Sequence, residues 1–186
     1  MISRLLRIAA PIAFFVLAIP ACAGDKPPAV GDEAKDFELD DVDGNKIKLS
    51  KFAGGKPVVL VVLRGNPGYQ CPLCTKQVAE LIAKGDDFAK AEAKVLLVYP
   101  GPAEKLIEKA KEFKKGVDYP KHFTMVTDPD YAFTKAYNLR WEAKNETAYP
   151  STFVIDGTNK VTFVLVSDQH GGRAKTADVL KALAAK

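Results

Sequence analysis

The chain has 186 residues, of which 47% are hydrophobic, 27% charged and 9% aromatic. This composition is sufficient for the core of one domain and excludes collagen-like, mucin-like and wholly disordered chains. The formal net charge is only +4, with both signs interspersed, so no nucleic-acid partner is expected. Three cysteines are too few for a disulfide-stapled miniprotein.

Residues 1–23 have the three-part pattern of a secretory signal peptide. Two arginines precede an apolar run at residues 8–19, and small residues follow at 21–23. The run is short for a bilayer span, which needs about 20 residues, although an uncleaved anchor is the alternative. We expect cleavage before Gly24 and export to the periplasm or the cell exterior. The segment ending at Cys22 also resembles a bacterial lipobox, and after cleavage only lipid on that cysteine would give the protein a membrane attachment.

A Pro/Gly-rich linker at residues 24–32 precedes the predicted domain, residues 33–186. Segments 37–39 and 46–49 flank an Asp-Gly-Asn turn and predict a hairpin. The β-branched run 57–63 predicts a strand buried on both faces, and a loop then leads to a helix from about residue 73 to 91.

The second half of the chain continues this alternation of strands and helices. Strands are expected at 94–99, 122–126, 151–155 and 160–166, and helices at 103–115, 131–137 and 174–185. Such alternation favours a mainly parallel sheet with helices on both faces, to which the last two strands add an antiparallel hairpin. The predicted fold class is therefore α/β and thioredoxin-like: a central mixed sheet flanked by helices, with an added N-terminal β-hairpin.

Cys71-Pro72-Leu73-Cys74 lies where the first buried strand passes into a helix. Two sulfurs at this spacing can form a disulfide, and a helix N-terminus favours the thiolate of Cys71. Pro72 suits a first helical turn. The alternatives are an inert structural disulfide or half of a zinc site. A structural zinc site needs four ligands, and the sequence has no second CxxC, so no metal and no cofactor is expected.

Pro150 immediately precedes the predicted strand 151–155. Thioredoxin-type folds place a cis-proline at this point, and its backbone would face the CxxC and position a substrate. An ordinary trans proline at the start of an edge strand is the alternative. In the context of the CxxC we expect the cis form.

These residues resemble the redoxin branch of the thioredoxin superfamily, which includes the AhpC/TSA peroxiredoxins. The resemblance covers most of the chain after residue 30, and it is carried by the opening at 31–39, the strand–loop–CxxC–helix, and the stretch 151–161. It implies a thiol-dependent antioxidant enzyme that uses an external thiol reductant.

The sequence departs from the peroxiredoxin pattern Pro-x-x-x-Thr-x-x-Cys at one position. Pro67 and Cys74 fit the pattern, but Cys71 replaces the threonine. The family frame makes Cys74 the peroxide-attacking cysteine, whereas thioredoxin logic makes it Cys71. The arginine that the family has near Pro150 is also missing. The residues that could stabilise a thiolate in its place are Arg64, Arg140 and Arg173, although arginines are mostly exposed, which favours a surface charge or a loop donor for each.

The main functional prediction is an exported oxidoreductase that exchanges disulfides through Cys71 and Cys74, with protein or small-molecule substrates. The close alternative is a hydroperoxide reductase with Cys74 oxidised first. A copper chaperone using both cysteines and His170, and a binding module with a fixed disulfide, are further alternatives. Tyr69 precedes the motif by two residues and could contact substrate, as could Pro67.

Overall fold

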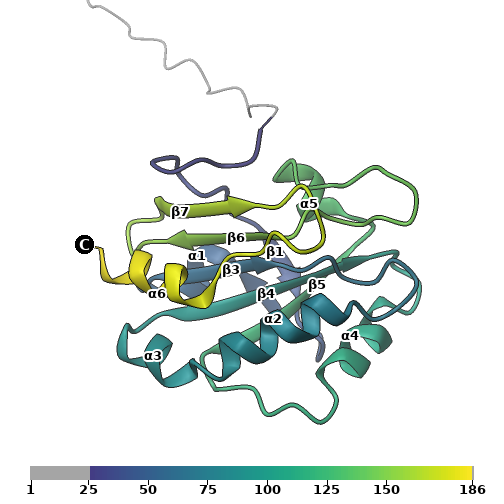
Figure 1. The fold of residues 1–186 in the computed structure, drawn as a ribbon, viewed down its shortest axis with the longest axis horizontal. Coiled ribbons are helices and arrows are strands. Elements are labelled where there is room, and N and C mark those ends of the chain that lie inside the picture. The colour runs from purple at the N-terminus through teal and green to yellow at the C-terminus, as the bar shows by residue number, and fades with distance from the viewer. Residues whose placement is uncertain (1–25, 186) are drawn as a thin grey trace, which may run out of the picture.

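A computed structural model describes residues 26–185 of the chain. The predicted signal peptide and Cys22 lie outside these residues. Five strands form the central sheet in the order β5-β4-β3-β6-β7 (Figure 1). Their bounds are β3 Val58–Val62, β4 Lys94–Gly101, β5 Phe123–Pro129, β6 Ser151–Ile155 and β7 Val161–Val166.

The sheet is mixed, as the sequence predicts. β3, β4 and β5 run parallel, β6 pairs antiparallel with β3, and β7 forms the edge next to β6. The predicted N-terminal hairpin is a separate two-stranded sheet of β1 (Glu38–Asp40) and β2 (Lys46–Lys48). The fold class is therefore confirmed.

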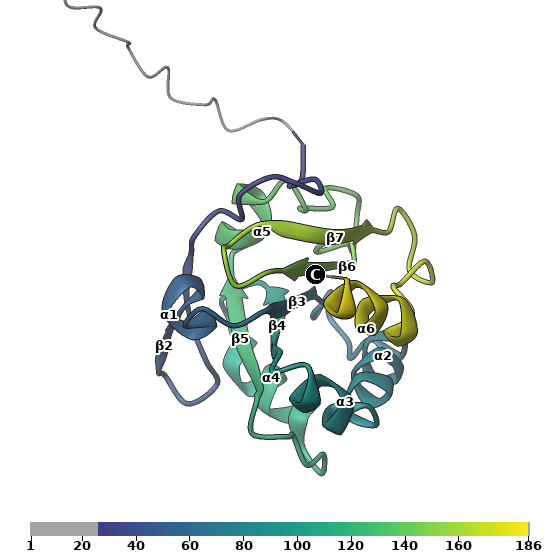
Figure 2. The ribbon, with the colours of Figure 1, turned by 90° about the vertical axis from the view of Figure 1, so that its left-hand side faces the viewer.

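Helices cover both faces of the sheet (Figure 2). On one face, α2 (Pro72–Ile82), α3 (Gly85–Lys90), α4 (Leu106–Lys114) and α6 (Thr176–Ala184) pack on one core cluster. On the other face, α1 (Leu49–Ala53) and α5 (Ala132–Ala136) pack on a second cluster. Alternate residues of β3 point into the two clusters, which explains why its sequence is apolar throughout.

The helix predicted over residues 73–91 is wrong in one respect, because it is two helices. Ala83 and Lys84 separate α2 from α3, and Lys84 leaves helical geometry with φ −107° and ψ 17°. A Cβ on Gly85 would lie 2.9 Å from the ring of Pro120, so this close approach requires glycine. The local sequence pattern does not contain this contact between Gly85 and Pro120.

The N-terminal segment lies along the start of β7. Gly31 N donates to the Val161 carbonyl at 2.8 Å, and Val161 N donates to the Asp32 carbonyl at 2.9 Å. None of the helices between residues 26 and 185 is long and apolar enough to cross a membrane.

Candidate active site

The CxxC follows a tightly held loop between β3 and α2. Gly65 adopts φ +70° and packs so closely on β4 that a Cβ there would lie 1.9 Å from the Pro100 carbonyl oxygen. Asn66 N donates to the same carbonyl at 3.0 Å. These two contacts fix the backbone of the loop against β4. The loop ends at Cys71, which is the N-cap of α2, and Pro72 lies in the first turn of the helix.

Both cysteines are free thiols, and both belong to the core on the α2 face. Cys71 is 3% exposed and Cys74 has no exposed surface. The backbone N–H of Cys74 donates to the Cys71 carbonyl at 3.0 Å, which closes the first turn of the helix. The two sulfurs thus sit together at the mouth of α2, as the motif predicts, with Cys71 nearer the surface.

Arg173, in the segment before α6, supplies the positive charge at the sulfurs. Its Nη2 lies 3.3 Å from the Cys74 Sγ and 3.7 Å from the Cys71 Sγ. Its Nη1 donates to Gln77 Oε1 at 2.6 Å, and its Nε donates to the His170 carbonyl at 3.1 Å. The guanidinium plane is therefore held between α2 and the 167–173 loop.

The two thiols ionise as a pair. A hydrogen bond from the Cys74 thiol, and then the charges of Arg173 and Arg64, lower the pKa of Cys71 to about 5, although burial opposes this. The pKa of Cys74 is raised, because its thiol donates to Cys71 and because burial disfavours a second thiolate. At neutral pH the site therefore holds one thiolate, on Cys71, beside one protonated thiol.

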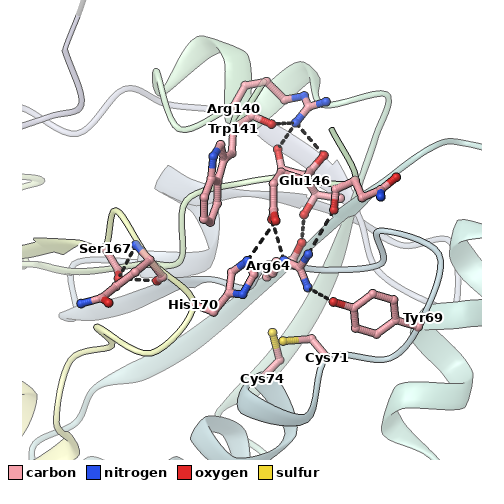
Figure 3. Close-up of polar contacts among 12 residues, drawn as sticks. Arg64, Tyr69, Cys71, Cys74, Arg140, Trp141, Glu146, Ser167 and His170 are labelled. Carbon is pink, nitrogen blue, oxygen red and sulfur yellow. Dashed lines mark hydrogen bonds and ion pairs between the residues drawn. The ribbon is translucent and has the colours of Figure 1, made fainter. Parts of the chain in front are cut away.

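Arg64 lies at the end of β3 but is satisfied by other partners (Figure 3). Its Nε pairs with Glu146 Oε2 at 2.7 Å, its Nη1 donates to the Tyr69 hydroxyl at 2.6 Å, and its Nη2 donates to the Asn145 carbonyl at 3.0 Å. The other Glu146 oxygen lies 3.0 Å from His170 Nε2. Burial opposes the ionisation of Glu146, but hydrogen bonds from Arg64 and His170 outweigh it and lower its pKa.

Arg140 does not reach the sulfurs. Its Nη1 donates to the backbone carbonyls of Trp141, Glu146 (2.9 Å) and Thr147 (2.6 Å), so it closes the 140–148 loop (Figure 3). Trp141 stacks on Tyr149 with ring centroids 4.9 Å apart. Of the three predicted arginines, Arg173 contacts both sulfurs, Arg64 acts on Cys71 from a distance, and Arg140 positions the neighbouring loop.

The prediction for Pro150 is wrong in its isomer. No peptide bond between residues 26 and 185 is cis. The Tyr149 N–H donates to the Leu139 carbonyl at 2.8 Å, and the Pro150 carbonyl accepts from Ser167 N at 2.9 Å. These bonds to segments on both sides hold an extended trans entry into β6, and they occupy groups that a substrate peptide would need.

The other predicted contact residues lie on the loop before the motif. Tyr69 is 53% exposed and its hydroxyl accepts from Arg64, while Pro67 is half-buried. Leu73, inside the motif, is also exposed, and a hollow of about 160 Å³ between α2 and residues 171–175 includes Leu73, Gln77 and Arg173 in its wall. Exposed apolar side chains and a charged hollow thus flank the buried sulfurs.

The copper hypothesis finds no support. Over residues 26–185, no three His, Cys, Asp or Glu side chains are grouped so that they could hold an ion together. His170, its proposed third ligand, pairs instead with Glu146.

Sequence reasoning missed Gln77 and Glu146. Gln77 follows Cys74 by three residues in α2, so helical spacing could have placed it on the same face. Nothing local to Glu146 indicates that it would reach Arg64, which is 82 positions earlier in the chain.

Comparisons with known proteins agree with this geometry. The model of the AhpC/TSA family matches residues 30–164. A putative peroxiredoxin of Mycobacterium tuberculosis is 29% identical over 136 residues, which cover 70% of this chain and 80% of that protein. Peroxiredoxin Bcp of Escherichia coli is 28% identical over 142 residues, covering 76% and 81%.

The structural comparison gives the same result. The crystal structure of peroxidoxin BcpB from Mycobacterium tuberculosis superposes with a TM-score of 0.69 at 25% identity, over 85% of this chain and 97% of that one. Because the family model spans most of the domain and the two thiols lie at its strand-to-helix junction, this chain belongs to the AhpC/TSA family of peroxiredoxin-like thiol oxidoreductases.

Proposed function

We propose that this protein reduces hydroperoxides with Cys71 and Cys74. One observation carries the proposal: in a chain of the AhpC/TSA family, the Arg173 guanidinium lies 3.3 Å from the Cys74 Sγ and 3.7 Å from the Cys71 Sγ. The thiolate is the form of cysteine that attacks peroxide. A guanidinium beside it stabilises the negative charge on the sulfur and then on the leaving oxygen.

The reaction has two steps on the protein. The Cys71 sulfur attacks the outer oxygen of the hydroperoxide, so an S–O bond forms, the O–O bond breaks, and the leaving oxygen takes up a proton to become water or an alcohol. The Cys74 sulfur then attacks the sulfenic sulfur, which forms the disulfide and releases water. An external thiol reductant restores the two thiols by exchange.

The family pattern and the thiol environments point to different cysteines for the attack on peroxide, and we assign this attack to Cys71. The family frame puts Cys74 in the attacking position. Cys74, however, has no exposed surface and its pKa is raised, whereas Cys71 is 3% exposed and its pKa is lowered to about 5. Disulfide exchange with protein substrates is the weaker function, since the backbone groups at Tyr149 and Pro150 already have partners.

Cysteine variants test this proposal. With a dithiol reductant present, we expect the wild-type protein to consume hydrogen peroxide catalytically and Cys71→Ser to lose this activity. Without added thiol, we expect Cys74→Ser to stop after one turnover with a sulfenic acid on Cys71, located by trapping with a dione and peptide mapping. A wild-type protein that reduces disulfides but not peroxide would overturn the proposal. Sulfenic acid forming at Cys74 in Cys71→Ser, as fast as in wild type, would overturn only the assignment of the attacking sulfur.

We also propose that the protein acts outside the cytoplasm. The support is the pattern of residues 1–23, with two arginines before an apolar run and small residues after it. Expression of the full chain in a Gram-negative bacterium, followed by fractionation and mass measurement, distinguishes a periplasmic protein starting at Gly24 from one lipidated at Cys22. A full-length product in the cytoplasm would contradict export.

A further inference from the structure

His170 forms a carboxylate–histidine pair beside the sulfurs. Its Nε2 lies 3.0 Å from Glu146 Oε1, and the other Glu146 oxygen is fixed by Arg64, whose side chain is 3% exposed (Figure 3). Trp141 packs on the imidazole with ring centroids 5.2 Å apart. The ring is therefore oriented on two sides, by a buried ion pair and by an aromatic neighbour.

The other ring nitrogen is available. Among residues 26–185 no contact engages Nδ1 of His170, and 43% of the His170 side chain is exposed. When both ring nitrogens carry protons, Nε2 donates to the Glu146 carboxylate and the second proton lies on Nδ1. Solvent can replace that proton after each turnover because the ring is partly exposed.

Arg173 connects this histidine to the reacting sulfurs. Its Nε donates to the His170 backbone carbonyl at 3.1 Å, while Nη2 of the same planar group reaches Cys74 at 3.3 Å and Cys71 at 3.7 Å. The backbone of His170 is thus held one guanidinium away from the two sulfurs. The groups that face its ring are Glu146, with Arg64 behind it, and Trp141; its own backbone carbonyl contacts Arg173.

We propose that His170 is the catalytic acid of peroxide reduction and that Glu146 positions it. This inference rests on the proposed function. When the Cys71 thiolate takes the outer oxygen, the O–O bond breaks and the inner oxygen leaves with the electron pair as hydroxide or alkoxide. Nδ1 of the imidazolium donates its proton to that oxygen, giving water or an alcohol and neutral imidazole. Arg173 stabilises the thiolate but carries no transferable proton near neutral pH, so it is not the acid.

The choice of oxidant tests this role directly. Hydrogen peroxide must expel hydroxide, a strong base, whereas peracetic acid expels acetate, which needs no proton. In rapid-quench, single-turnover measurements of thiol loss, we expect His170→Gln to react about 100-fold more slowly than wild type with hydrogen peroxide. With peracetic acid we expect the two rates to be nearly equal. Glu146→Gln should show the same selective loss to a smaller extent.

His122→Gln is the matched control, because His122 is the only other histidine in the chain and lies just before β5, at the opposite end of the parallel strands from the CxxC. It should match wild type with both oxidants. Equal rates of His170→Gln and wild type with hydrogen peroxide would overturn the acid role, and so would an equal loss with both oxidants, which would indicate a structural effect. If the wild-type protein itself fails to react with hydrogen peroxide, the proposed function fails instead.

Discussion

The three arginines near the site differ in which of their donors are already used. Arg64 has partners at Glu146, Tyr69 and Asn145, and Arg140 donates to three backbone carbonyls. Only Arg173 directs a donor at the sulfurs. An arginine has five N–H donors in a fixed plane, so the partners of the other donors decide where the charge lies. The role of thiolate stabilisation therefore falls to Arg173.

Replacing Arg173 should make the Cys71 thiolate less stable. The pKa of Cys71, about 5, should rise by about one to three in Arg173→Gln, since an opposite charge at this range has that effect. In the wild type, alkylation by iodoacetamide should be fast above pH 5 and fall away below it. In Arg173→Gln the same decline should begin at higher pH. Arg173→Lys keeps the charge and should shift the curve less. Overlapping alkylation curves for all three proteins would contradict the role of Arg173.

The features of the site that depend on residues close together in the chain were predicted from the sequence, and those that depend on distant residues were not. The CxxC and its place at a helix N-terminus depend on neighbouring residues and were predicted. The choice of Arg173 over Arg64 and Arg140 depends on contacts 99 and 102 positions apart, which no local pattern contains. Glu146 was missed for the same reason.

At the scale of elements, strands were predicted more reliably than helix breaks and proline geometry. β3 and β4 are buried on both faces, and their apolar runs show it directly. Next to the break between α2 and α3, Gly85 packs against Pro120, and beside the trans Pro150 the backbone bonds to Leu139 and Ser167, which are contacts that local patterns do not contain. The 140–148 loop is a similar case, because the Arg140 side chain closes it together with a backbone bond from Trp141 N to the Thr147 carbonyl.

Removing that closure should loosen the loop that carries Glu146. Arg140→Ala leaves three carbonyls without a charged donor and should lower the free energy of unfolding by about 1–3 kcal/mol. It should also alter the fluorescence of Trp141, the only tryptophan. Urea unfolding measures the first effect. Lys144→Ala, an exposed change in the same loop, is the control and should match wild type. An unchanged urea midpoint in Arg140→Ala would show that the loop does not need this residue.

At the scale of the whole molecule, the thiolate links the redox state of the site to the stability of the fold. The folded reduced protein holds an ionised Cys71, whereas an unfolded chain holds a thiol with a pKa near 8.5. The folded structure therefore gains stability from the thiolate above the unfolded pKa and loses it as the pH falls through about 5. A Cys71–Cys74 disulfide has no ionisable thiol, so only the reduced protein has this pH-dependent contribution to stability.

The stability difference between the reduced and the disulfide forms should consequently depend on pH. Between pH 5 and about 8.5 we expect the reduced form to gain about 1.4 kcal/mol relative to the oxidised form for each pH unit, because one proton is bound in the unfolded state and not in the folded one. Urea unfolding at several pH values, with and without reductant, measures this difference. The Cys71→Ser/Cys74→Ser double variant should show no dependence on reductant at any pH. A constant difference in the wild type would mean that folding does not stabilise the thiolate, and the electrostatic basis of the proposed peroxide chemistry would fail with it.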